Sequence, residues 1–186
     1  MRNMKGAPMS ASDTQTKIAF LRGLRAVRTF RPEPVSQEAL DDILLVARWS
    51  GSASNRQPWA FIVIKDRAML DALATKGYAG HLTSAPLAIA IVMDGEAGRQ
   101  EHEIWDEGRL AERIMLAAAA HRLGSCIGWL QGDGINEAKE LLGVPAERRL
   151  RTIISIGHID EPAQRARPKP PQARKPLTEL VHEERW

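Results

Sequence analysis

The segment SGSASNRQPWAFIVI, residues 50–64, changes character halfway along its length and suggests how the rest of the chain is organised. Its first half is small and polar, with side-chain amides on Asn55 and Gln57, and its second half is apolar. Because Pro58 restricts the backbone between the halves, we expect a loop that leads into a buried strand at residues 60–65. On these residues alone, a ligand-binding loop and a plain capped loop explain the polar half equally well.

Length and composition predict one globular domain. The chain has 186 residues, of which 44% are hydrophobic and 26% charged, and this allows a sizeable core. Its longest apolar runs, residues 85–93 and 114–120, are far shorter than the roughly 20 residues that span a bilayer. The N-terminus has no apolar core typical of a signal peptide, so we expect a cytoplasmic protein that does not enter a membrane. A single cysteine, Cys126, excludes an internal disulfide, and redox chemistry would need a bound cofactor.

The charge pattern favours a small anionic ligand. The net charge is +3, and arginines concentrate at residues 22–31 and 165–175. No aromatic residues alternate with them to stack on bases, so nucleic-acid binding is not expected. The five histidines show no metal-ligand spacing, and no Gly-x-Ser-x-Gly motif predicts a hydrolase.

Hydrophobic periodicity and turn residues predict an α+β fold with a mixed central sheet and helices on both faces. Asp13 and Ser36 are the expected N-caps of the first two helices, which are separated by an extended segment containing Pro32 and Pro34. Further helices are expected at residues 66–76, 103–123 and 135–142. Strands are expected at residues 60–65, 86–93, 125–130 and 151–157.

The C-terminal region differs from the rest of the chain. Residues 160–176 contain five prolines and five basic residues without an apolar pattern, which predicts an extended segment. The following LTELVHEERW carries apolar residues that require burial, so we expect an arm that packs on a second subunit. The alternative is a tail that folds back on its own chain. The predicted organisation is a disordered lead-in at 1–14, a domain at 15–159 and an arm at 160–186.

Several motifs together resemble the nitroreductase family of FMN enzymes. The longest is RAVRTFRPEPVSQEALDDILLVARWSGSASNRQPWAFIVI, and SAPLAIAIVM, LGSCIGWLQG, LLGVPAERRLRTIISIGH and RKPLTELVHEERW follow in the family's order. The resemblance covers nearly the whole chain from Leu21. It implies the nitroreductase fold, bound FMN, NAD(P)H as co-substrate, and a homodimer with flavin sites at the subunit interface.

The resemblance also implies which residues contact FMN. They are Arg25, Ala26, Val27 and Arg28; Ser52, Ala53, Ser54, Asn55 and Gln57; Leu130, Gln131 and Gly132; and Arg174 and Lys175. Arg25 and Arg174 are expected at the phosphate, because a guanidinium binds phosphate through two parallel hydrogen bonds. Arg28 is expected near the flavin pyrimidine, where its charge would stabilise the reduced anion.

The two loops have different expected roles in the family arrangement. Residues 52–55 would reach the flavin held mainly by the other subunit, while Gln57 would hold the turn. Residues 130–132 would present backbone N–H groups to the flavin N5 and O4. A helix N-terminus at Gly132 and Gly134 that binds phosphate is an alternative for that second segment.

Some positions depart from the family pattern or stay outside it. Leu24 and Ala26 stand where family members often have Arg and Ser, which removes two contacts unless Arg22 or the C-terminal arginines replace them. Tyr78 and His81 either shape the substrate side or are ordinary loop residues. Cys126 is expected to be an inert core thiol. Core packing is the expectation for three tryptophans that could otherwise line a pocket: Trp49, Trp105 and Trp129.

The activity that the resemblance implies is transfer of hydride from NAD(P)H to nitroaromatics, quinones or similar acceptors by a ping-pong mechanism. The flavin N5 would carry the chemistry, without a catalytic side chain or a metal. Two alternatives stay open. One is a protein that binds and sequesters FMN without turnover. The other is an enzyme of the same fold with different chemistry, such as dehalogenation, flavin destruction or azoline oxidation.

Overall fold

The computed structural model describes residues 11–168 and 172–186. Most of the predicted N-terminal lead-in, residues 1–10, lies outside the described residues. Residues 11–14, in contrast, belong to helix α1 (Ala11–Gly23). Asp13 is therefore in the first turn of that helix and is not its N-cap.

A five-stranded sheet forms the centre of the molecule. Its strands are β1 (Trp59–Ile64), β2 (Gly77–Tyr78), β3 (Leu87–Met93), β4 (Gly124–Leu130) and β5 (Arg149–Gly157). They lie in the order β1-β3-β5-β4-β2, and every neighbouring pair is antiparallel. The prediction of a mixed sheet is corrected here. Because β5 inserts between β3 and β4, the parallel strands β3 and β4 do not pair, and among described residues the parallel bridge is Ala26 with Ser125.

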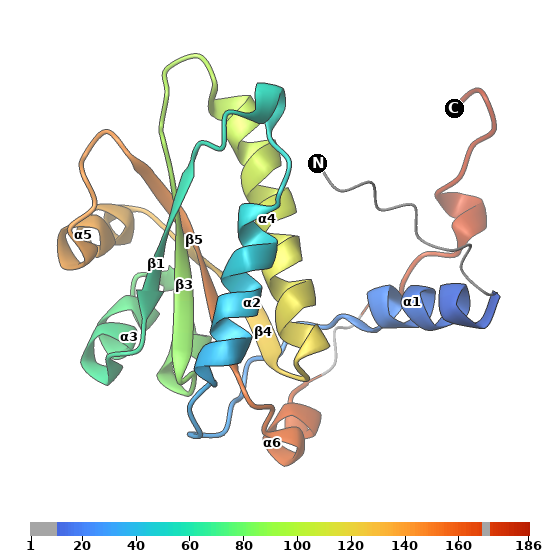
Figure 1. Ribbon diagram of the computed structural model, residues 1–186, viewed down its shortest axis with the longest axis horizontal. Coiled ribbons are helices and arrows are strands. Elements are labelled where there is room, and N and C mark those ends of the chain that lie inside the picture. Colours follow the sequence, from blue (N-terminus) through green and yellow to red (C-terminus); the bar gives the residue numbers. More distant parts are fainter. Residues whose placement is uncertain (1–10, 169–171) are drawn as a thin grey trace.

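Helices cover both faces of the sheet, as predicted (Figure 1). Helices α2 (Gln37–Arg48) and α4 (Gln100–Ala120) lie on one face, and α3 (Arg67–Ala74) and α5 (Asp133–Leu142) on the other. Ser36 caps α2 by accepting a hydrogen bond from Ala39 N at 3.2 Å, which confirms its predicted role. All seven residues of β3 are buried because both faces of this central strand are covered.

The chain ends lie apart from this body. Figure 1 shows α1 and the C-terminal residues projecting together to one side of the sheet and its helices. The first helix exposes Ile18, Phe20 and Leu21 by 41–51%. Four C-terminal apolar residues are exposed by 56–103%: Leu177, Leu180, Val181 and Trp186. No helix among residues 11–168 and 172–186 is long and apolar enough to cross a membrane.

The region after residue 159 is not wholly extended. Helix α6 (Glu161–Ala166) begins where Asp160 accepts a hydrogen bond from Ala163 N at 3.1 Å, and Pro162 is in its first turn. Proline favours that position because its missing N–H has no partner to lose there. The prediction of extended chain was therefore wrong for residues 161–166. Beyond this helix, residues 177–179 form one short 3-10 helix, η3 (Leu177–Glu179).

Candidate functional site

Arg25 and Arg174, the two residues predicted at a phosphate, line one open groove. The groove has a volume of about 730 Å³ and lies between the end of α1, helix α4 and the C-terminal arm. Arg25 Nη1 donates to Arg22 O and Leu24 O, both at 2.7 Å, so the end of α1 holds its guanidinium. Arg22 also lines the groove, whereas Lys175, the other predicted basic residue, does not. Opposing these cations, Glu112 is the acidic residue of the lining.

The predicted binding segment 26–28 lies along the edge of β4. Val27 N donates to Ser125 O at 2.8 Å, and the Val27 side chain is buried in a cluster with Phe30 and Ala85. Gln164 of α6 accepts from Arg28 N at 3.0 Å and donates to Ala26 O at 3.2 Å. This amide therefore fixes the segment from the outside. The sequence did not predict this role for Gln164, because the residue lies in a proline-rich, basic stretch.

The loop at residues 52–57 has a constrained backbone. Ser54, Asn55 and Gln57 have φ values of 53°, 55° and 52°. A positive φ costs most non-glycine residues about 1–2 kcal/mol, and Asn tolerates it better than Ser or Gln. Ser52 Oγ accepts from Gln57 N at 2.8 Å, and Gln57 Nε2 donates to Asn55 O at 3.2 Å. Gln57 thus holds the turn, as predicted, and the surrounding contacts maintain a conformation that the loop would not adopt alone.

Two buried carboxylates of α4 each hold a loop, Asp106 the 52–57 loop and Glu103 the loop between β3 and α4. Asp106, 4% exposed, accepts from Ala53 N at 3.3 Å and pairs with Arg109 at 3.4 Å. One turn earlier, Glu103 accepts from Gly95 N at 3.2 Å and Glu96 N at 3.0 Å, and it is 2% exposed. Neither residue was predicted to matter. The sequence offered one indication of their role. Glu103 and Asp106 are three residues apart and therefore lie on the same side of a helix.

Residues 130–132 comprise the last residue of β4 and the two residues that follow it. Leu130 is 1% exposed and pairs with Gly77 of β2, a strand that the sequence did not predict. Gln131 N donates to Lys76 O at 3.0 Å, so this predicted donor already has a partner. Gly132 has φ 54° and ψ −136°, a conformation that glycine adopts readily, and it leads directly into α5.

His81 and Cys126 are packed beside β4. Burial lowers the pKa of His81 to about 4, and the nearby positive charge of Arg28 adds to this shift. The imidazole lies against Gly128, where a Cβ would be 3.0 Å from Nε2. His81 is therefore a neutral packing residue at pH 7. Burial also raises the pKa of the Cys126 thiol, which is consistent with an inert core residue.

The tryptophans contradict the prediction of core packing. Trp49 and Trp105 are exposed by 73% and 75%, and Trp129 by 47%. Trp129 lies opposite Tyr78 in the β2–β4 pair, and the Arg151 guanidinium is 5.0 Å from its ring centroid. The spacing of apolar residues could not predict that these tryptophans are exposed. An apolar face of a helix or strand has the same spacing whether or not another part of the chain covers it.

One protomer does not bring all the predicted segments together. The 52–57 loop precedes β1, and residues 130–132 follow β4, at the same end of the sheet. Because β3 and β5 lie between β1 and β4, the two segments are separated by three strand spacings, about 14 Å. The groove with Arg25 lies near Ser125, at the opposite end of β4.

Comparisons with known proteins agree on one family. The profile described as the nitroreductase family matches residues 21–76 and 71–158. A protein of Archaeoglobus fulgidus, provisionally named NADH dehydrogenase/NAD(P)H nitroreductase, is 31% identical over 149 residues, covering 76% of this chain and 83% of the relative.

Two solved structures share the fold at similar identity. An FMN-dependent nitroreductase of Clostridium difficile R20291 is 30% identical with a TM-score of 0.74, covering 91% of this chain and 99% of that one. A Desulfovibrio desulfuricans protein, provisionally named a nitroreductase and solved in complex with FMN, is 32% identical with a TM-score of 0.72, covering 91% and 96%. With the profile spanning most of the sequence, this chain belongs to the nitroreductase family.

Proposed function

We propose that the protein is an FMN-dependent oxidoreductase that passes hydride from NAD(P)H to nitroaromatic, quinone or similar electron-poor acceptors. One observation carries the proposal. Arg25 and Arg174 are 149 positions apart in the sequence, yet they line the same groove. Two guanidiniums in an open groove suit a phosphate, which carries about two negative charges at neutral pH.

The residues present fit FMN. The groove would supply cations for the phosphate end, and Arg22, which also lines it, would replace the family arginine that is missing at Leu24. Arg28 is exposed, and its backbone is fixed by Gln164, so its guanidinium is available to the flavin pyrimidine. When bound, FMN would supply reversible acceptance of hydride, which none of the side chains of this site can provide.

The protein's own residues would position the reactants. The 52–57 loop presents small side chains and the Asn55 amide in a conformation that its contacts fix in advance, so little order is lost on binding. Residues 130–132 would limit the approach of the flavin ring, with Gly132 leaving space at the backbone. Neutral His81 packs behind β4 and would not act as a proton donor at pH 7.

We further propose a homodimer. The resemblance to the family implies that the 52–57 loop of a second subunit would complete the site beside the arginine groove. The apolar residues of α1 and of the C-terminal arm are exposed in the single chain and would be buried against that subunit. Domain exchange of such an arm is a common route to a dimer.

An absorbance experiment tests the proposal. The purified protein should show oxidised-flavin bands, which bleach anaerobically on adding NADPH or NADH and return on adding a nitroaromatic or quinone. Bands that persist with both donors would favour FMN sequestration. Absence of flavin, with no binding of added FMN, would contradict both functions.

A further inference from the structure

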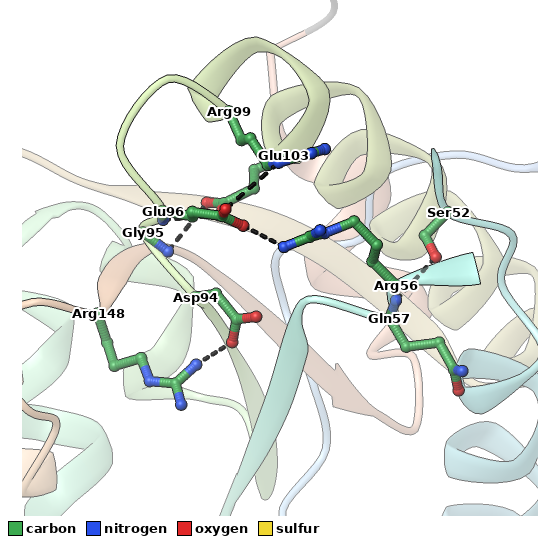
Figure 2. Close-up of polar contacts among 9 residues, drawn as sticks. All are labelled: Ser52, Arg56, Gln57, Asp94, Gly95, Glu96, Arg99, Glu103 and Arg148. Carbon is green, nitrogen blue, oxygen red and sulfur yellow. Dashed lines mark hydrogen bonds and ion pairs between the residues drawn. The ribbon is translucent and has the colours of Figure 1, made fainter. Parts of the chain in front are cut away.

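We propose that Glu96, in the loop between β3 and α4, is a positioning residue that holds the 52–57 loop in the conformation that faces the flavin. The inference rests on the proposed function for its flavin contact, but the contacts that carry it belong to the chain alone. Figure 2 shows Glu96 between Arg56 of the 52–57 loop and Arg99 of the β3–α4 loop.

The backbone at Glu96 is fixed from the helix side. Glu103 accepts hydrogen bonds from the N–H groups of Gly95 and Glu96, at 3.2 and 3.0 Å. Glu103 itself is buried and pairs with Arg149 of β5 at 3.5 Å. Glu96 is therefore attached to the sheet and to α4, which are the most buried parts of the molecule.

The Glu96 side chain then connects this rigid part to the loop. One carboxylate oxygen pairs with Arg56, and the other lies 3.4 Å from Arg99 Nε. Arg56 is flanked in sequence by Asn55 and Gln57, two of the three loop residues with positive φ. The ion pair of Arg56 therefore opposes relaxation of the strained backbone. At the other side of the loop, the hydrogen bond from Ala53 N to Asp106 has the same effect.

The Arg56–Glu96 pair is nearly half exposed, at 42% and 44% of the two side chains, so its effect on global stability is small. We therefore expect its loss to change the loop and the ligand affinity more than the unfolding temperature. The same β3–α4 loop offers a matched control. Asp94 pairs with Arg148 at similar exposure and does not contact the 52–57 loop through its side chain.

The test compares Glu96→Gln with Asp94→Asn in the full-length protein. Glu96→Gln should raise the Kd for FMN about 3- to 5-fold, because an exposed ion pair contributes up to about 1 kcal/mol. It should also speed trypsin cleavage of the Arg56–Gln57 bond in flavin-free protein, measured by mass spectrometry. Asp94→Asn should change neither quantity, and both variants should unfold near the wild-type temperature.

Several outcomes would overturn the inference. Equal cleavage at Arg56 in the two variants would show that Glu96 does not hold the loop, whether or not FMN binds. Faster cleavage with an unchanged Kd would show that the loop position is irrelevant to flavin. If wild type binds no FMN, the proposed function fails while the cleavage comparison still tests the contact.

A double-mutant cycle gives an independent check. Arg56→Gln, Glu96→Gln and the double variant should raise the FMN Kd to a similar extent, because each removes the same contact. Additive effects would mean that the two residues act separately, and the positioning role would then be wrong.

Discussion

The 52–57 loop is held by side chains of the folded body, whereas the groove around Arg25 and Arg174 lies where the exposed chain ends meet helix α4. Asp106 accepts a hydrogen bond from Ala53 N of the loop, Glu96 pairs with Arg56, and Ser52 Oγ accepts from Gln57 N to close the turn. The groove, in contrast, is bounded by α4 on one side and by α1 and the C-terminal arm on the others, and the apolar side chains of these two chain ends are largely exposed. The contacts of the loop are therefore present in the single chain, whereas in the proposed dimer a second subunit would cover the chain ends beside the groove.

The largest expected effect tests the dependence of the chain ends on a partner. Leu180→Glu combined with Val181→Glu should weaken the dimer about 100-fold or more, because burial of each aliphatic side chain contributes about 1.5–3 kcal/mol. Light scattering after size exclusion at micromolar concentration would measure the change. Arg185→Gln, which alters charge in the same segment but removes no apolar surface, is the control. A dimer that survives the double change would locate the interface elsewhere.

The groove itself should bind the phosphate end of the cofactor. Arg25→Ala or Arg174→Ala should each raise the Kd for FMN about 10- to 100-fold, since a hydrogen bond to a charged group contributes about 1.5–3 kcal/mol. Affinity for riboflavin, which lacks the phosphate, should stay unchanged. Flavin fluorescence titration measures both ligands, and Arg31→Ala, outside the groove and paired with Glu33, is the control. Equal losses for FMN and riboflavin would mean that the arginines contact the ring or only maintain the fold.

The third prediction concerns His81, a residue packed beside β4 in the body of the molecule. Its pKa falls from 6.5 in the unfolded chain to about 4 in the folded protein, so the unfolded state binds more protons between these values. Stability should therefore be lost as the pH falls through this window, by about 2 kcal/mol from this residue at pH 5. Denaturant unfolding of wild type and His81→Gln at pH 7 and pH 5 would measure the contribution of His81 to this loss of stability. An equal loss in both proteins would show that His81 is not buried in its neutral form.

The smallest expected effect concerns the internal support of the loop. Ser52→Ala removes the acceptor for Gln57 N and should cost about 1 kcal/mol, which lowers Tm by about 2–4 °C in a chain of this size. Differential scanning calorimetry would measure the shift. Ser54→Ala, in the same loop but without that hydrogen bond, provides a comparison. A larger loss for Ser54→Ala would indicate that backbone strain, and not the side-chain bond, dominates the loop.

Local patterns predicted the body well. Ser36 as a cap, the uninterrupted apolar strand β3 and the helices on both faces all follow from hydrogen-bonding groups and apolar spacing within a few residues. The family motifs likewise indicated the arginines and the polar loop. These features depend on neighbours in sequence, which is why the sequence contains them.

The remaining features depend on contacts between distant segments. The insertion of β5 between β3 and β4, the two-residue strand β2, and the exposure of Trp129 come from strand order. The hydrogen bond that holds the 52–57 loop is also a long-range contact, because Asp106 is 53 positions from Ala53. No local pattern contains such pairings.

The sequence by itself determined the class of fold, the family and the residue types of the candidate site, because caps, periodicity and motifs act over short distances. Only the tertiary structure decided that Arg25 and Arg174 line one groove and that Glu96 pairs with Arg56. The physical reason is that burial and ion pairing act in space, and chain folding alone sets which distant residues become neighbours.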